Sequence, residues 1–377
     1  MKLSKLSIIS TALIAGGVSC VGAAEDFRSD RSDAVFVMTN DAGGNEVVAY
    51  DRTAYGTLSS PHRYSTGGRG SGGKVDPLAS QGSLTLSQDG NWLFAVNAGS
   101  GNLSVFRVEG SRLFLTDKIA TEGSEPTSVT QRGSLVYVLN SAGSSSVVGF
   151  RFAFGHLDRI PDSLQFLSAN LANPGSVALS PNGQFLVVTE KASSTIDVFR
   201  VLGNGTLGPI TNNKNVGPGT FSATFAPSGV AFVAETGVAG ATNGSAVSSF
   251  AVQANGTVSP ISLSLPTLGG ANCWIEVTPN GRFVYMSNSA SASIAGFAIG
   301  NNGALTAIPG TIVAVGATGS TNIDLTISAD GKYLYTLNAG NGTLGEFAID
   351  PATGHLTSLG TVSGLPAAGG LNGIAAN

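Results

Sequence analysis

A unit of about 50 residues repeats along this chain, and the repeat limits the folds that the chain can adopt. Residues 173–210 contain one complete copy. Within it, Gly175–Ser180 and Thr195–Val201 alternate as half-buried strands do, and a shorter strand is expected at Thr206–Ile210. Phe185–Thr189 is an apolar run typical of a strand that is covered on both faces. The copy therefore predicts one antiparallel sheet of four strands.

Tight turns and aromatic residues mark the other copies. The turn Ser180–Gly183 joins the first two strands, and its Asn and Gly accept the positive φ that a hairpin needs. An aromatic residue marks the third strand of each copy, at Tyr50, Phe106, Phe150, Phe199, Phe250, Phe297 and Phe347. Seven marks predict an all-β fold, a seven-bladed β-propeller of four-stranded antiparallel blades, as a single domain over residues 33–377.

The two ends of the repeat complement each other. Asp33–Thr39 matches a second strand with no first strand before it, and Leu371–Ala375 matches a first strand with nothing after it. Pairing of these segments would close the ring and remove exposed sheet edges. Two Gly-rich insertions, Ser65–Ser80 and Gly237–Ser245, are predicted to be mobile.

The N-terminal segment and the charge predict where the protein works. Residues 1–24 have the basic start, apolar stretch and small C-terminal residues of a secretory signal peptide, and residues 25–32 are predicted to be a disordered lead-in. Only 11% of all residues are charged, without a basic cluster, which argues against nucleic acid as a partner. No other apolar run is long enough to span a membrane. We expect a secreted, extracellular or periplasmic monomer that contacts no membrane.

After removal of the signal peptide one cysteine remains, Cys273, so no intrachain disulfide is expected. Five Asn-x-Ser/Thr sequons serve either as tight turns or, in a eukaryotic host, as glycosylation sites. They begin at Asn102, Asn204, Asn243, Asn255 and Asn341.

The repeat unit resembles that of the seven-bladed propeller lactonases, the group of 6-phosphogluconolactonases and 3-carboxy-cis,cis-muconate lactonising enzymes. The likeness is carried by Gly183–Glu190, a glycine and apolar strand ending in an acid, and by the Ser-Thr-containing strand Ser193–Phe199. It extends from about residue 33 to the end, and it implies a propeller with lactonase-like activity.

The Arg-His pair that commonly opens a first strand in that family is missing. The corresponding positions read Gly82-Ser83, Thr127-Ser128, Gly175-Ser176, Phe221-Ser222, Cys273-Trp274 and Ile323-Asp324. The family's His- and Arg-dependent chemistry is therefore not carried over to this chain.

In each blade the second strand runs antiparallel to the first, so all the second strands end at the same mouth of the central channel. The residues at these strand ends are therefore expected to form a ring around that mouth. They are Asn40, Asn97, Asn140, Glu190, Glu235, Asn288 and Asn338. The asparagines from Asn97 onward are candidate substrate ligands, although Asn in this position commonly caps the following turn. Glu190 and Glu235 depart from the repeat and are candidate catalytic acids or bases. Lys191 is a candidate for stabilising negative charge, and Lys214 and Trp274 are further candidate substrate contacts.

Glu276 and Asp324 are acids in first strands, where the other copies carry small or hydroxylated residues close to the propeller axis. Because an unpaired buried charge is costly, we expect these acids to hydrogen-bond to hydroxyls of neighbouring blades. The less favoured alternative is a Ca²⁺-like cation held by these acids and amide oxygens. Otherwise no metal and no cofactor is expected. Arg69 or Lys74, in the first insertion, is a candidate lid over the channel mouth.

Two functions fit these residues. One is a secreted lactonase-like hydrolase, or a muconate-type lactonising cyclase, with a carboxylate site at the channel mouth. The alternative is a non-catalytic extracellular propeller that binds a small polar ligand, a glycan or a protein. The missing Arg-His pair and the abundance of Asn, Ser and Thr favour the alternative, so the sequence leaves open whether the protein is an enzyme.

Overall fold

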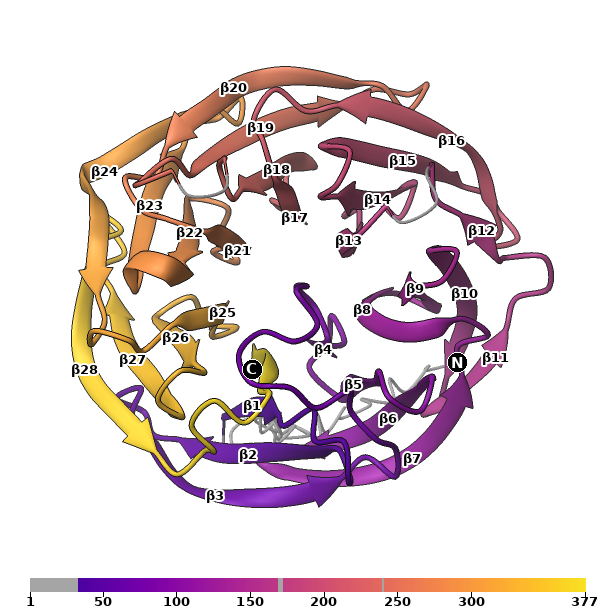
Figure 1. The fold of residues 1–377 in the computed structure, drawn as a ribbon, viewed down its shortest axis with the longest axis horizontal. Helices are drawn as coiled ribbons and strands as arrows, with labels where there is room; N and C mark the ends of the chain where they lie inside the picture. The colour runs from indigo at the N-terminus through magenta and orange to yellow at the C-terminus, as the bar shows by residue number, and fades with distance from the viewer. Residues whose placement is uncertain (1–32, 169–171, 239–240) are drawn as a thin grey trace, which may run out of the picture. The chain divides into compact units, whose positions relative to one another are not determined.

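The computed structural model describes residues 33–168, 172–238 and 241–377, and the predicted signal peptide and lead-in lie outside these residues. In the described residues, seven antiparallel sheets surround a central channel (Figure 1). This arrangement confirms the predicted seven-bladed β-propeller.

Within each blade the strands follow one another from the channel outward. The first three blades are β29 (Asn372–Ala376), β1 (Ala34–Met38), β2 (Glu46–Arg52) and β3 (Leu58–Ser65); β4 (Leu84–Leu86), β5 (Trp92–Asn97), β6 (Asn102–Glu109) and β7 (Arg112–Ala120); β8 (Ser124–Arg132), β9 (Leu135–Ala142), β10 (Ser146–Ala153), β11 (His156–Arg159) and β12 (Gln165–Phe166). The fourth and fifth are β13 (Pro174–Leu179), β14 (Phe185–Glu190), β15 (Thr195–Val201) and β16 (Leu207–Lys214); β17 (Thr220–Phe225), β18 (Val230–Glu235), β19 (Ala246–Val252) and β20 (Val258–Pro266). The last two are β21 (Asn272–Val277), β22 (Phe283–Asn288), β23 (Ser293–Ile299) and β24 (Leu305–Val315), with the 3-10 turn η1 (Ser289–Ser291); and β25 (Asn322–Ile327), β26 (Tyr333–Asn338), β27 (Thr343–Ile349) and β28 (Leu356–Ser363).

The C-terminal strand closes the ring, as predicted. β29 is the innermost strand of blade 1 and pairs antiparallel with β1, with Ile374 opposite Val37. Blade 3 departs from the four-stranded pattern because its outer strand is divided. Both β11 and β12 pair with β10, and between them Ile160 and Ser163 still hydrogen-bond to Gly149 of β10, at 3.0–3.1 Å.

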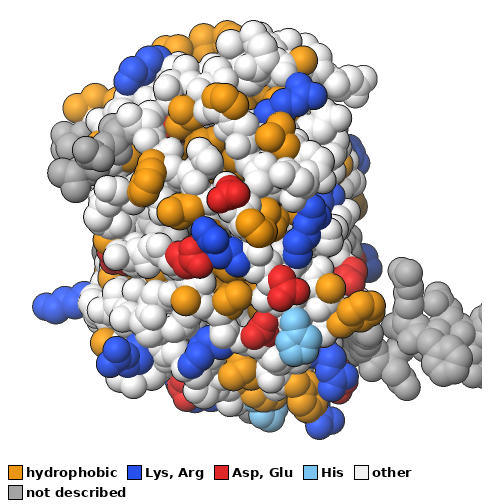
Figure 2. Space-filling view, turned by 90° about the vertical axis from the view of Figure 1, so that its right-hand side faces the viewer, with side chains coloured by type: hydrophobic (Ala, Val, Ile, Leu, Met, Phe, Trp, Pro, Cys, Tyr) orange, Lys and Arg blue, Asp and Glu red, His pale blue; other side chains and the backbone are white. Residues whose placement is uncertain are grey.

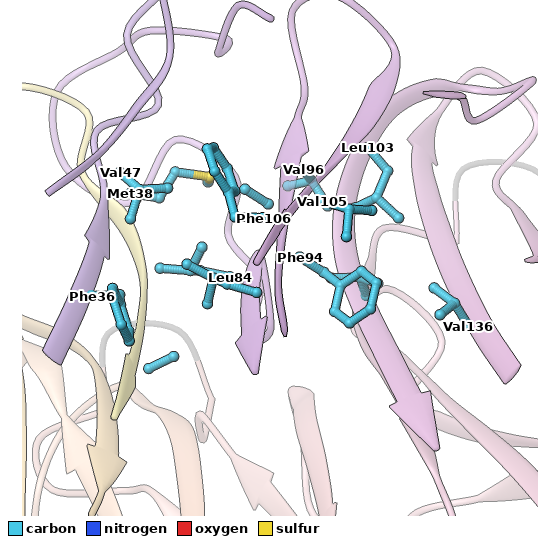
Figure 3. Packing of buried hydrophobic residues seen from close by; sticks show 14 of the residues in the cluster. Phe36, Met38, Val47, Leu84, Phe94, Val96, Leu103, Val105, Phe106 and Val136 are labelled. Carbon is cyan, nitrogen blue, oxygen red and sulfur yellow. The ribbon is translucent and has the colours of Figure 1, made fainter. Parts of the chain in front are cut away.

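Apolar side chains fill the spaces between neighbouring blades. Phe36 and Met38 from blade 1 face Leu84 from blade 2, whereas Phe94 from blade 2 lies on the side of Val136 from blade 3, and all five are buried (Figure 3). Because each blade is covered on both faces, its second strand is buried at nearly every position, which explains the continuous apolar runs in the sequence.

The first Gly-rich insertion, Ser65–Ser80, is not the mobile loop that we predicted. It is tied down by backbone hydrogen bonds, such as the one from the Gly70 N–H to the carbonyl oxygen of Asp41 at 2.8 Å. The side chains of Arg69 and Lys74, predicted as a lid, are exposed. Part of the second insertion lies outside the described residues.

The outer surface carries few charges. On the side shown in Figure 2, basic and acidic side chains are interspersed among uncharged ones. In the part of the chain that the structure describes, no helix has the length and apolar character needed to cross a membrane.

Candidate functional site

Residues 76–82, which we call the crossing segment, run through the channel at the end where the inner strands begin (Figure 1). The Gln81 N–H donates to the carbonyl oxygen of Gly175 in blade 4, at 3.0 Å. The Gln81 side-chain amide makes two hydrogen bonds with the backbone of Ile275 in blade 6, at 2.8 and 2.9 Å. Partners in two different blades show that the segment spans the channel. The open mouth that we predicted at this end is therefore wrong.

Two predicted substrate contacts hold this segment in place. Lys191 Nζ donates to the carbonyl oxygen of Ala79 and lies 4.7 Å from the centre of the Phe221 ring. Trp274, which is 1% exposed, donates from Nε1 to the carbonyl oxygen of Ser80 at 3.0 Å. Both side chains bind the protein's own chain in this structure.

Ionisable groups gather at the start of the crossing segment and beside it. Burial raises the pKa of Asp76 to about 7, although a hydrogen bond from Asn372 and the charge of Lys191 lower it. Burial lowers the pKa of Lys191 to about 8, against the opposing charges of Asp76 and Cys273. Burial also raises the pKa of the Cys273 thiol. These groups belong to the closed end of the channel.

Glu190 lies in the interior between blades rather than on the channel wall. Its carboxylate, which is 0% exposed, accepts hydrogen bonds from the N–H and hydroxyl of Ser168 and from the Ser193 hydroxyl, at 2.6–3.1 Å. Burial opposes ionisation, but hydrogen bonds from Asp197 and these serines outweigh it and lower the pKa of Glu190. Burial and the neighbouring Glu190 raise the pKa of Asp197 to about 8.

Glu235 has a similar environment in blade 5. Asn215 Nδ2 and the Ser248 hydroxyl donate to its Oε1, at 3.0 and 2.6 Å, and the Ser264 hydroxyl donates to Oε2 at 2.8 Å. Lys214 is exposed and donates to the Ser193 carbonyl oxygen at 2.8 Å. The structure thus brings neither glutamate together with Lys191 or Lys214 in one accessible space, and catalysis by these residues stays a prediction.

The ring residues, which follow the second strands, pack tightly against glycines of the segments that connect the blades. Each of four glycines in the segments that connect successive blades lies so close to a ring side chain that a Cβ would fall within 2.4 Å of it. The pairs are Gly68 with Asn97, Gly123 with Asn140, Gly217 with Glu235, and Gly269 with Asn288. The ring residues therefore hold the connecting segments, and they are 0% exposed apart from Asn338, which is 6% exposed.

The accessible part of the channel lies beyond the crossing segment. Two cavities of about 230 and 220 Å³ occupy it, and Gln81, Gly82 and Thr85 border both. The smaller one extends along the inner strands to the turn at Pro181, which joins a first strand to a second strand. The channel can therefore receive a ligand from the face of these turns, opposite to the mouth that we predicted.

Glu276 and Asp324 both border the larger of these cavities. The Asp324 carboxylate accepts the N–H of Leu325 at 2.9 Å and that of Ile374 at 3.3 Å, and its backbone has a left-handed φ of 57° at a bulge. Burial raises its pKa to about 8. Glu276 has no hydrogen bond within the described residues, and burial together with the charge of Asp324 raises its pKa to about 8. The expected pairing of both acids with hydroxyls is wrong.

In blades 3 and 4, small hydroxyls accept a backbone N–H from the inner strand of the next blade. Ser128 accepts the N–H of Val177 at 3.1 Å, and Ser176 accepts that of Ala223 at 2.9 Å. The Asp324 carboxylate likewise accepts the N–H of Ile374 in the closing strand β29. This carboxylate therefore has a structural role. Glu276 is the acid in this cavity whose carboxyl group the fold leaves unpaired, and sequence periodicity signalled it as an exception.

The described residues contain no group of three or more His, Cys, Asp or Glu side chains that could hold a metal ion. The alternative of a channel cation stays a prediction.

The comparisons with known proteins agree with this architecture. The family described as "Lactonase, 7-bladed beta-propeller" matches residues 33–164. A putative 6-phosphogluconolactonase from Bacteroides fragilis is 20% identical, with a TM-score of 0.68 over 93% of this chain and 98% of the other. The periplasmic gluconolactonase of Pseudomonas aeruginosa is 20% identical, with a TM-score of 0.69 over 89% and 97%. At these identities the likeness concerns the fold, and no curated protein matches the sequence.

Proposed function

We propose that this chain, a lactonase-like seven-bladed propeller, hydrolyses a small uncharged lactone in the part of its channel bordered by Glu276 and Asp324. One observation carries the proposal. Glu276 places an acid with a pKa of about 8 beside a cavity of about 230 Å³, and no hydrogen bond within the described residues accounts for its carboxyl group. Perturbed acids in concave sites are the groups that enzymes use for proton transfer.

The pair has the chemistry that lactone hydrolysis needs. Two carboxyl groups in a poorly solvated channel do not ionise together easily, so over a range of pH one is ionised and the other carries a proton. The ionised group takes a proton from water as the water oxygen attacks the lactone carbonyl carbon. The neutral group gives its proton to the ring oxygen as the carbon–oxygen bond breaks, which yields a hydroxy acid. Repulsion between the acid pair and the product carboxylate favours product release.

The charge of the cavity supports an uncharged substrate. Among the described residues that border the cavity of Glu276 and Asp324, none is Lys or Arg. Arg132 borders the neighbouring cavity on the other wall. A phosphorylated lactone or a muconate dicarboxylate would place like charges beside the two acids. Hydrolysis of a neutral sugar lactone, the chemistry named in the Pseudomonas relative, therefore fits better than muconate-type cyclisation.

Binding without catalysis is the second candidate. It is favoured by the hydrogen bonds that Asp324 accepts from Leu325 and Ile374, because they engage one member of the pair in the fold. In that case Glu276 would act as a hydrogen-bonding group for a small polyol or glycan.

The test compares hydrolysis rates of glucono-1,5-lactone and its 6-phosphate. Wild type is assayed beside Glu276→Gln, Asp324→Asn and the ring variants Glu190→Gln and Glu235→Gln. Glu346→Gln is the control, since Glu346 is a buried acid between blades. We expect Glu276→Gln to lower kcat by roughly 10²-fold or more, the usual contribution of acid–base catalysis. Equal rates in wild type and Glu276→Gln would overturn the hydrolase proposal. Absent hydrolysis, with lactone binding lost only in Glu276→Gln, would establish the binding function.

We also propose that the protein is secreted. Support comes from the signal-like character of residues 1–24 and from the periplasmic location named for the Pseudomonas relative. N-terminal sequencing of the protein exported from its host should begin at Glu25, and retention of residue 1 would refute the proposal.

A further inference from the structure

A groove of about 380 Å³ lies between blades 2 and 3, on the face where the first strands turn into the second strands. The described residues that border it are all different from those that border the two channel cavities. Its volume falls within the roughly 300–1,000 Å³ that is usual for small-molecule sites. We propose that this groove binds one neutral sugar ring.

The groove exists because the first turn of blade 3 is short. Gly133 and Ser134 alone join β8 to β9, whereas residues 87–91 join β4 to β5 and residues 180–184 join β13 to β14. In blades 6 and 7, a Cβ on the turn glycine would lie 3.4–3.6 Å from a proline of the preceding blade's turn. A Cβ on Gly133 would meet no atom within 4 Å. The short turn therefore leaves open the space that a longer turn would fill.

Two aromatic side chains supply the apolar wall of the groove. Trp92, the first residue of β5, is partly exposed, and Phe152 of β10 is 9% exposed. Their rings meet edge to face with centroids 5.3 Å apart, so each ring helps to fix the position of the other. A sugar ring has C–H groups that can lie on an aromatic surface of this kind, because the faces of aromatic rings carry partial negative charge.

Polar groups that the fold leaves available border the same groove. The Trp92 indole N–H and the Gln88 side-chain amide have no hydrogen-bond partner within the described residues, and neither group is fully buried. Gln131 Oε1 accepts the backbone N–H of Gln88 at 3.1 Å, and Gln131 Nε2 donates to the Gly133 carbonyl oxygen at 2.6 Å. The Gln131 amide keeps one lone pair and one N–H for a ligand. These donors and acceptors match the hydroxyls of a sugar, each of which both donates and accepts.

Asp89 is the one charged side chain among the described residues that border the groove, and it disfavours an anionic ligand. Burial opposes its ionisation, but hydrogen bonds from Ser87 and Asn91 outweigh burial and lower the pKa of Asp89. A quaternary ammonium ion is the alternative ligand for an aromatic wall beside a carboxylate. Such a cation cannot accept a hydrogen bond from Trp92 or Gln88, whereas a neutral sugar can.

The test uses fluorescence, because Trp92 and Trp274 are the two tryptophans of the chain. Trp274 is 1% exposed, so acrylamide, a water-soluble quencher, acts mainly on the partly exposed Trp92. Glucose, N-acetylglucosamine and choline are titrated against wild type, Gln88→Ala and the matched control Gln253→Ala, an equally exposed glutamine in blade 5. We expect saturable protection of Trp92 by glucose or N-acetylglucosamine in wild type and Gln253→Ala. The half-saturating concentration should rise by roughly two- to tenfold in Gln88→Ala, the value of one hydrogen bond.

Both variants should melt at the temperature of wild type, because the two side chains are exposed. Protection by choline alone, absence of protection, or equal half-saturating concentrations in Gln88→Ala and Gln253→Ala would overturn the proposal. Glu276→Gln should bind the sugar as wild type does, and Gln88→Ala should hydrolyse lactone at the wild-type rate. Failure of the sugar proposal is therefore distinguishable from failure of the hydrolase proposal.

Discussion

Replacing Asp197 by Asn is expected to stabilise the protein at alkaline pH and to leave it nearly unchanged at acid pH. Asp197 is 0% exposed, and Asn212 Nδ2 donates to its Oδ1 at 2.7 Å. Its Oδ2 has no donor beside it, so it hydrogen-bonds the Glu190 carboxylate only while it carries a proton. Asn has almost the same shape and supplies a permanent N–H donor in place of that proton.

The magnitude follows from proton linkage. The pKa of Asp197 is raised from 3.8 to about 8 in the folded protein. The folded state therefore binds the proton more tightly, and its stability falls as the pH rises from the ordinary value through the raised one. Between pH 5 and pH 8 the upper limit is about 4 kcal/mol, at about 1.36 kcal/mol for each pH unit. Relaxation around the ionised pair reduces this, and we expect Asp197→Asn to gain about 1–2 kcal/mol at pH 8, or roughly 2–4 °C in Tm.

The assay is urea unfolding of wild type and Asp197→Asn at several values between pH 5 and pH 8.5. Asp158→Asn, in an exposed position on β11, is the control and should follow wild type at every pH. The reasoning predicts that the two stability curves lie closest together at pH 5 and diverge as the pH rises toward 8. Parallel curves for wild type and Asp197→Asn would show that the Glu190–Asp197 pair holds no proton.

Three further changes test the architecture. Deletion of residues 369–377 should abolish soluble expression because it removes the closing strand, and a deletion variant that melts like wild type would contradict this. Gly217→Ala should lower the free energy of unfolding in urea by about 1–3 kcal/mol, because the added Cβ would lie 1.9 Å from a carboxylate oxygen of Glu235. Gly203→Ala is the control and should be nearly neutral, because a Cβ there would meet no atom within 4 Å. Gln81→Ala should lower the free energy of unfolding by about 1–3 kcal/mol, because it leaves the backbone N–H and C=O of Ile275 unpaired. The exposed control Gln253→Ala should cause no such loss. Equal losses in the two variants would exclude a role for Gln81 in holding the crossing segment.

The two acids that border the channel cavity could be predicted from the sequence, but the surroundings of the two ring glutamates could not. Glu276 and Asp324 stood out because they break a pattern of small hydroxyls in the first strands, and both border the channel cavity. Glu190 and Glu235 broke a pattern too, but their partners come from connecting segments of variable sequence. No spacing rule indicated that serines would surround Glu190 between blades.

The sequence by itself determined the blades, their number and the closure of the ring. Those features depend on alternation, tight turns and a period, which are local properties that recur seven times. The tertiary structure decided which end of the channel is accessible. The decisive contact joins Gln81 to Ile275, which are 194 residues apart, and it depends on the path of one insertion across the channel. Such a contact leaves no periodic trace, because it occurs only once in the chain.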